Sequence, residues 1–289
     1  MNNKGFAVSM ILYSIMALFV FVMLLILTLN ASNSRNQENI SSEIKEQLSV
    51  NNYTDLKTAI LSDNEIKENA ILSTTSLLAG DNGLYMAVEN ENKIYYYRGD
   101  VKNNYVIFAD KLWRIVRITE NGNIRLMLND NIGYHYIDEG PMYANFIYSN
   151  VYNVLLDWYN ANLISYDNLI ISDRFKESYV DDISTYTKPY FALGGSFVNL
   201  KIGLITLDEA MYAGLYPGIL NNKTYFFPDY IFTMTMADYN NVQRMVSIDG
   251  DAITTDPVDE TQVIKPVINI NPNVIVKGIG TIDNPYVVQ

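Results

Sequence analysis

The feature that most constrains this chain is an apolar run near its amino terminus. Phe6 to Leu29 form 24 consecutive residues without a charged side chain, directly after Lys4-Gly5. As an α-helix this run is roughly 36 Å long, enough to cross the hydrocarbon core of a bilayer with some tilt. It is well beyond the roughly 7–15 residues of a secretory-signal core. We therefore predict an uncleaved membrane anchor, held in the lipid bilayer by Phe6 to Leu29, and a polar domain after it.

The rest of the chain is acidic and lacks cysteine. Lysine and arginine number 20 against 32 aspartates and glutamates, which gives a net charge of −12. Such a chain repels phosphate backbones, so we expect no nucleic-acid partner. The absence of cysteine excludes disulfides, thiolate zinc sites and cysteine nucleophiles. The one histidine, His135, leaves no histidine pair for a metal site and argues against a histidine-based catalytic relay.

Lys4-Gly5-Phe6 followed by an apolar helix resembles the leader of type IV prepilins. In that family a membrane peptidase cleaves after the glycine. The resemblance therefore implies processing between Gly5 and Phe6, a cytoplasmic leader over residues 1–5 and an outward-facing body. The sequence departs from the family at Met10, where pilins usually carry a glutamate that neutralises a neighbour's amino terminus in the filament. This departure argues against a major filament subunit, and a plain signal anchor that begins with the same residues is the alternative.

The segment after the apolar run has helical spacing. Ile40, Ile44 and Leu48 recur at i, i+4 and i+8, which places them on one face of a helix. Ser62-Asp63-Asn64-Glu65 has the Ser-x-x-Glu form of a capping box and predicts the start of a second helix. We therefore predict a helical juxtamembrane stalk over residues 30–82, in two pieces that break near Asn51-Asn52.

From residue 83 to 289 the pattern predicts an α+β domain of mainly antiparallel strands with a few helices. Glu120-Asn121-Gly122 indicates a hairpin turn, because Asn-Gly readily adopts positive φ. Val151–Asn162 has a helical apolar stripe, and Thr206-Leu207-Asp208-Glu209 predicts a capping box for a short helix that Gly214 ends. Strands are expected at Lys93–Arg98, Tyr105–Ala109, Leu112–Ile118, Asn123–Leu128, Ile231–Met236, Val242–Ile248, Val263–Ile270 and Pro285–Val288.

Segments of this region, taken in order, are similar to an uncharacterised domain family of Gram-positive bacterial surface proteins. They include Tyr96-Tyr97-Arg98-Gly99, Leu112–Ile118 and Asn284–Val288. The order is also similar to C-type-lectin-like domains of the formylglycine-generating-enzyme type. The counterparts here are Leu204–Glu209, Tyr230–Met236 and Lys265–Ile270. Because this chain lacks both the cysteines of that enzyme and the calcium signature of the lectins, the resemblance implies the scaffold alone.

An acidic cluster is the candidate metal site. Asp249-Gly250-Asp251 and Asp256 could supply carboxylate oxygens to calcium, which takes six to eight oxygen ligands. The alternative is a hairpin turn, since Asp-Gly lies between two apolar stretches. We expect no other cofactor.

Adjacent carboxylates occur at Asp208-Glu209, Asp181-Asp182 and Asp138-Glu139, but glycoside hydrolysis needs two carboxyl groups that face each other across a bond. We therefore expect no enzyme activity. The 23 tyrosines suit both a β-rich core and contacts to a glycan or protein.

These observations predict a single-pass protein of the bacterial plasma membrane with its carboxy-terminal domain outside the cell. Its head is expected to bind a glycan or a protein, or to serve as a structural part. The alternative is a pilin-like subunit that forms a homo-oligomer or filament through its amino-terminal helix.

Overall fold

The computed structural model describes residues 53–68, 77–89, 91–139, 146–177, 179–180, 182–187, 189, 196–239 and 242–289. The expected anchor Phe6 to Leu29, the processing residues Gly5 and Phe6, and the helical face at Ile40 lie outside these residues. No helix within the described part of the chain is long and apolar enough to span a membrane. Asn52–Gln289 form one compact unit.

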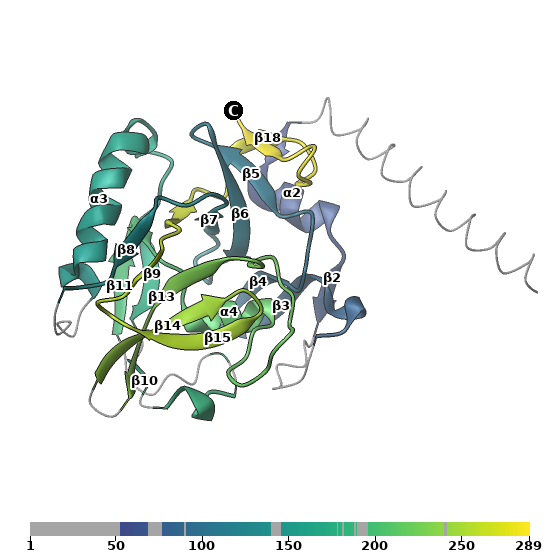
Figure 1. The fold of residues 1–289 in the computed structure, drawn as a ribbon. Helices are drawn as coiled ribbons and strands as arrows, with labels where there is room; N and C mark the ends of the chain where they lie inside the picture. The colour runs from purple at the N-terminus through teal and green to yellow at the C-terminus, as the bar shows by residue number, and fades with distance from the viewer. Residues whose placement is uncertain are drawn as a thin grey trace, which may run out of the picture. The chain divides into compact units, whose positions relative to one another are not determined.

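The larger sheet is mixed and forms the centre of this unit (Figure 1). Among the described residues it has 11 strands, in the order β1-β18-β19-β5-β6-β4-β3-β2, with β7 joining β6 to β17 and β12 pairing with β17. Its strands are β1 (Thr54–Asp55), β2 (Ile66–Glu68), β3 (Gly83–Glu89), β4 (Asn92–Arg98), β5 (Tyr105–Phe108), β6 (Lys111–Ile118), β7 (Ile124–Leu128), β12 (Ile202–Gly203), β17 (Val267–Ile270), β18 (Ile275–Lys277) and β19 (Tyr286–Val288).

Two further sheets lie among the described residues. The first is built on the antiparallel pair β13–β14, and the second is the antiparallel pair β9–β11. Their strands are β8 (Tyr134–Tyr136), β10 (Tyr179–Val180), β13 (Tyr230–Tyr239), β14 (Val242–Asp249), β15 (Ala252–Pro257) and β16 (Thr261–Val263) in one sheet, and β9 (Asp173–Glu177) and β11 (Ser196–Leu200) in the other.

Three α-helices lie among the described residues: α2 (Leu56–Asp63), α3 (Asn150–Asn162) and α4 (Leu207–Ala213). Four short 3₁₀ turns accompany them: η1 (Ala79–Asp81), η2 (Phe146–Tyr148), η3 (Ile164–Tyr166) and η4 (Ile183–Thr185). In α3 the residues Val151, Leu155 and Tyr159 are buried. This is the apolar stripe that the sequence predicts, because residues four apart share one face of a helix.

Much of the predicted secondary structure is confirmed, and the domain is of the α+β class. The strands expected between residues 93 and 128 correspond to β4–β7, and Gly122 closes the β6–β7 hairpin with φ +82°. The strand expected over Val263–Ile270 is wrong as a single element, since it divides into β16 and β17. Lys265-Pro266 lies between them, and the proline has no N–H to donate to a sheet.

The helix expected to begin at Ser62 is also wrong, because α2 ends at Asp63. It begins instead after Asp55, whose side chain accepts a hydrogen bond from the Thr58 backbone N–H at 2.8 Å. Leu56 and Ile60 are fully buried in the core. The described part of the segment expected as a stalk, residues 53–68 and 77–82, belongs to the compact unit that begins at Asn52.

Candidate functional site

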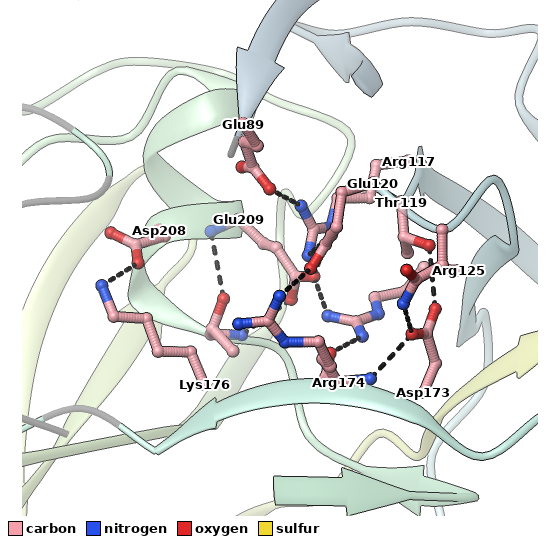
Figure 2. Close-up of polar contacts among 12 residues, drawn as sticks. Glu89, Arg117, Thr119, Glu120, Arg125, Asp173, Arg174, Lys176, Asp208 and Glu209 are labelled. Carbon is pink, nitrogen blue, oxygen red and sulfur yellow. Dashed lines mark hydrogen bonds and ion pairs between the residues drawn. The ribbon is translucent and has the colours of Figure 1, made fainter. Parts of the chain in front are cut away.

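A buried group of charged side chains surrounds the start of α4 (Figure 2). Thr206 and Glu209 form the predicted capping box: the Glu209 N–H donates to Thr206 Oγ1 at 3.2 Å, and the Thr206 N–H donates to Glu209 Oε2 at 3.0 Å. Thr206 is therefore the N-cap of a helix whose seven residues are all buried. The capping box places the Glu209 carboxylate inside the protein, where it needs a cationic partner.

Two arginines from neighbouring strands supply that partner. Arg117 on β6 donates from Nε to Glu209 Oε1 at 3.0 Å, and Arg125 on β7 donates to the same oxygen. Arg117 also donates from Nη1 to Glu89 Oε2 on β3 at 2.9 Å. Burial by itself would raise the pKa of Glu209, but the charges of Arg125 and Arg117 outweigh it and hold that pKa below its ordinary value.

This charged group is a structural element of the core. The cavity beside it has a volume of about 20 Å³, enough for roughly one water molecule and too small for a substrate. General acid–base catalysis needs a carboxyl group whose pKa lies near the working pH, whereas the pKa of Glu209 is shifted away from neutrality. Asp208 pairs with Lys176 Nζ at 2.9 Å, so this neighbouring carboxylate is also held in an ion pair.

A second polar cluster lies on the β6–β7 hairpin. Asp173 accepts hydrogen bonds from Thr119 Oγ1 at 2.8 Å, Asn121 Nδ2 at 2.6 Å and Asn123 Nδ2 at 2.9 Å. Burial raises the pKa of Asp173, and these bonds together with the Arg174 N–H outweigh that effect and lower it. These hydrogen bonds join β9, which carries Asp173, to the β6–β7 turn, which carries the three donors.

The three aspartates considered for calcium lie at or near the β14–β15 hairpin, which confirms the turn that Asp249-Gly250 predicts. Asp249 ends β14, Asp251 lies in the turn, and Asp256 lies on β15. Asp256 accepts a hydrogen bond from the Tyr230 hydroxyl at 2.9 Å, and burial together with this bond raises the pKa of Tyr230 to about 12. No group of three His, Cys, Asp or Glu side chains within the described residues is arranged to hold a metal ion.

The remaining sequence candidates are placed as follows. His135 lies on β8, an edge strand, and its Nε2 atom is 3.3 Å from the Ile132 carbonyl oxygen. Glu139 accepts a hydrogen bond from the Tyr136 hydroxyl, and its N–H donates to Asp138 Oδ1 at 3.0 Å. Asp182 caps η4, and Asp181 lies outside the described residues. None of these side chains lines the small cavity beside Glu209 or the cleft described next.

A ligand-sized cleft lies elsewhere, between the β5–β6 turn, the loop after β7, and α3. Its volume is about 480 Å³, within the range of small-molecule sites. Two leucines from β6 and β7 line it, and the remaining lining residues are Asp110, Lys111, Asn129, Asp130, Asn131 and Trp158.

Local backbone structure fixes the rim of this cleft. Ala109 and Asp110 have φ +52° and +57°, as the two central residues of a type I′ hairpin turn require, so the turn sets the position of Asp110. On the opposite side the Asn129 N–H donates to the Leu112 carbonyl at 3.0 Å, and Lys265 Nζ donates to the Asn129 carbonyl at 2.7 Å. The loop after β7 is thereby held against both β6 and the segment before β17.

The aromatic wall of the cleft is Trp158 on α3. Its ring packs edge to face against the fully buried Trp113, with centroids 6.3 Å apart and planes at 68°. Trp113 donates from Nε1 to the Phe108 carbonyl at 2.9 Å, so this second ring is itself fixed. The Lys111 ammonium lies 5.7 Å from the Trp158 centroid, within cation–π range.

The sequence pattern does not indicate this cleft. Trp158 falls within the apolar stripe expected over Val151–Asn162, and its ring is in fact partly exposed. The polar run Asn129-Asp130-Asn131 after a buried strand was the available signal, because polar residues at the end of a buried strand often line a site. The turn residue Asp110 carries no such signal, since any hairpin favours aspartate there.

Comparison of the chain with protein-family models, with curated proteins and with solved structures finds no match.

Proposed function

We propose that this protein is a membrane-anchored glycan-binding protein of the bacterial surface, with no catalytic activity, and that its head binds sugar in the cleft beside Trp158. The observation that carries the proposal is the cleft itself: an open site of about 480 Å³ with one aromatic wall and a rim of amides and carboxylates. Sugars have faces of C–H groups that pack on aromatic rings, and hydroxyls that pair with such polar groups.

The lining favours binding of a small ligand over a flat protein contact. A stable protein partner buries roughly 800 Å² on each side, whereas the polar groups here converge on a concave space. The rim is also organised before any ligand arrives. The Asn131 N–H donates to Asp130 Oδ1 at 2.9 Å, and the Gly133 N–H donates to Asn131 Oδ1 at 3.0 Å. Such pre-organisation lowers the entropy that binding must overcome.

The proposal excludes catalysis because of where the two rim carboxylates lie. A glycosidase needs one carboxyl group that burial keeps protonated and a second that stays charged. Asp110 and Asp130 are both exposed, so neither is desolvated in the way the acid requires. The buried carboxylate Glu209 is held by two arginines away from this cleft. Binding without turnover is the function these groups support.

The membrane part of the proposal rests on the sequence. Phe6 to Leu29 would hold the protein in the plasma membrane as a single-pass anchor, and the head would lie outside the cell. The finer assignment of the head to the C-type-lectin-like class is part of the same proposal. It is supported by the capping box at Thr206 and by strands at two of the three segments that carry the resemblance, β13 and β17.

The alternative function is that of a pilin-like subunit, supported by Lys4-Gly5-Phe6. The Gly5→Ala variant separates the two. Under the pilin-like alternative it blocks processing and surface assembly, whereas a plain anchored head reaches the surface unchanged. Immunoblotting of sheared and cell-bound fractions measures the difference.

The test of glycan binding uses the intrinsic fluorescence of the full-length protein in detergent. The chain has two tryptophans, and Trp113 is fully buried, so a saturable change on adding oligosaccharide reports on Trp158. We expect such a change with a panel of neutral and N-acetylated oligosaccharides, and its loss in Trp158→Ala when binding is measured by calorimetry. Tyr53→Ala, which removes an exposed ring outside the cleft lining, is the matched control and should bind as the wild type does. No binding to any member of the panel would reject the proposal.

A further inference from the structure

The side-chain ammonium of Lys111 lies over the aromatic ring that forms one wall of the cleft. The Lys111 Nζ atom lies 5.7 Å from the centroid of Trp158, at a distance where the negative face of the ring attracts positive charge. Lys111 belongs to the cleft lining and is the first residue of β6, directly after the β5–β6 turn. Its long side chain can leave the ring without any change in the strand, because the attachment point is fixed and the stem is flexible.

The other charges in the lining are negative. Asp110 and Asp130 lie on the rim, and with Lys111 they give the lining a net charge of −1 (one positive group against two negative groups). The chain as a whole carries a net charge of −12. A ligand with a positive charge lowers the electrostatic repulsion within the rim, whereas an anion increases it.

Both features belong to one cleft. A ligand ammonium placed over Trp158 would replace that of Lys111, in a cleft that the exposed carboxylates of Asp110 and Asp130 also line. A neutral sugar gains the ring contact and hydrogen bonds to the rim, but no contact between opposite charges. The geometry points to an amine-bearing glycan, such as one rich in unacetylated hexosamine, as the preferred ligand of this cleft, with Lys111 occupying the ammonium position until the ligand arrives. This inference rests on the proposed glycan-binding function.

The experiment compares a glucosamine oligosaccharide with its fully N-acetylated counterpart of the same length. The two oligosaccharides have the same sugar backbone. They differ at the nitrogen, which is a charged amine in one and a neutral amide in the other. Calorimetry on the full-length protein in detergent gives the ratio of the two affinities at low salt. We expect the glucosamine form to bind about tenfold more tightly, as one cation–π contact and two partly screened charge contacts allow. The ratio should fall in 0.5 M NaCl, where the Debye length shortens to about 4 Å.

Three variants locate the effect. Asp110→Asn with Asp130→Asn should bring the affinity ratio close to one. Lys111→Met should raise the affinity for the glucosamine form about threefold, because no internal cation then competes for the ring. Asp283→Asn is the matched control, since it removes an exposed carboxylate outside the cleft lining and should leave the ratio at the wild-type value.

The outcomes separate this inference from the function on which it rests. Equal affinity for the two oligosaccharides, or tighter binding of an oligosaccharide of uronic acids, would overturn the preference for an amine and leave glycan binding intact. A preference that persists in the double aspartate variant would overturn the assignment of the charge to this rim. Absence of binding to every oligosaccharide would reject the glycan-binding function and the inference together.

Discussion

Glu209→Gln is the variant that tests the internal charge network most sharply. The substitution keeps the shape of the side chain and removes the carboxylate charge that pairs with Arg125, whereas Arg117 keeps its pair with Glu89. The side chain of Arg125 is 1% exposed and that of Arg117 is 10% exposed, so neither guanidinium can recover its hydration by a small movement. Removing one partner of a buried ion pair costs about 3–5 kcal/mol. For a domain of this size, that loss corresponds to a fall of roughly 6–20 °C in the unfolding temperature.

The pH dependence of stability gives the same test an independent readout. Because the pKa of folded Glu209 is lowered, the carboxylate stabilises the fold fully above the ordinary glutamate pKa of about 4.3. This contribution is lost as pH falls from there through the lowered folded-state pKa. The difference in unfolding free energy between wild type and Glu209→Gln should therefore be constant near neutrality and should shrink on acidification.

Urea titration of the full-length protein in detergent, followed by far-ultraviolet circular dichroism, measures both quantities. Asp100→Asn is the control, because Asp100 and Lys102 form an exposed ion pair with side chains 41% and 73% exposed. Its loss should cost less than about 1 kcal/mol. A cost for Glu209→Gln as small as that of the control, with no change of the difference at low pH, would refute the assignment of a buried, charged network.

The remaining predictions concern other parts of the fold. Asp173→Ala should lower stability by about 2–5 kcal/mol, because buried donors of the β6–β7 hairpin lose their acceptor; chemical denaturation measures it, and a neutral result would contradict the described cluster. Gly278→Ala should prevent stable folding, since its Cβ would lie 2.0 Å from the Pro285 carbonyl oxygen, whereas Gly218→Ala, also at positive φ but in open space, should cost only about 1 kcal/mol. Expression yield and unfolding temperature of the pair check this, and equal behaviour would contradict it. Millimolar calcium should leave the unfolding temperature of the wild type unchanged, since Asp256 is engaged with a tyrosine hydroxyl; a calcium-dependent rise would restore the acidic cluster as a metal site.

The sequence predicted well those features that depend on a few neighbouring residues, such as helix caps and tight turns. The capping box at Thr206 and the helix stop at Gly214 were correct because each places a specific hydrogen bond or a positive φ within one turn. The Asn121-Gly122 hairpin was correct for the same reason. By contrast, Ser62 to Glu65 has the form of a capping box yet lies at a helix end. The stronger cap at Asp55 and the burial of Leu56 and Ile60 determine where α2 lies.

Features that depend on residues distant in sequence could not be predicted. The cleft combines a turn after β5, a loop after β7 and a ring on α3, and nothing in the local pattern indicates that these meet. The same holds for Arg117 and Arg125, which read as ordinary strand residues until β6 and β7 bring them to the cap of α4. Pairings such as β1 with β18 join the two ends of the unit, and no short-range signal specifies them.

The central claim is that the cleft beside Trp158 binds a glycan without cleaving it. One measurement tests both halves: incubation of the full-length protein with an oligosaccharide that titrates the fluorescence of Trp158, followed by mass analysis of the sugar. The account predicts saturable binding that is lost in Trp158→Ala and an oligosaccharide of unchanged mass after prolonged incubation. Shortened oligosaccharide products, or a fluorescence signal that no oligosaccharide changes, would contradict it.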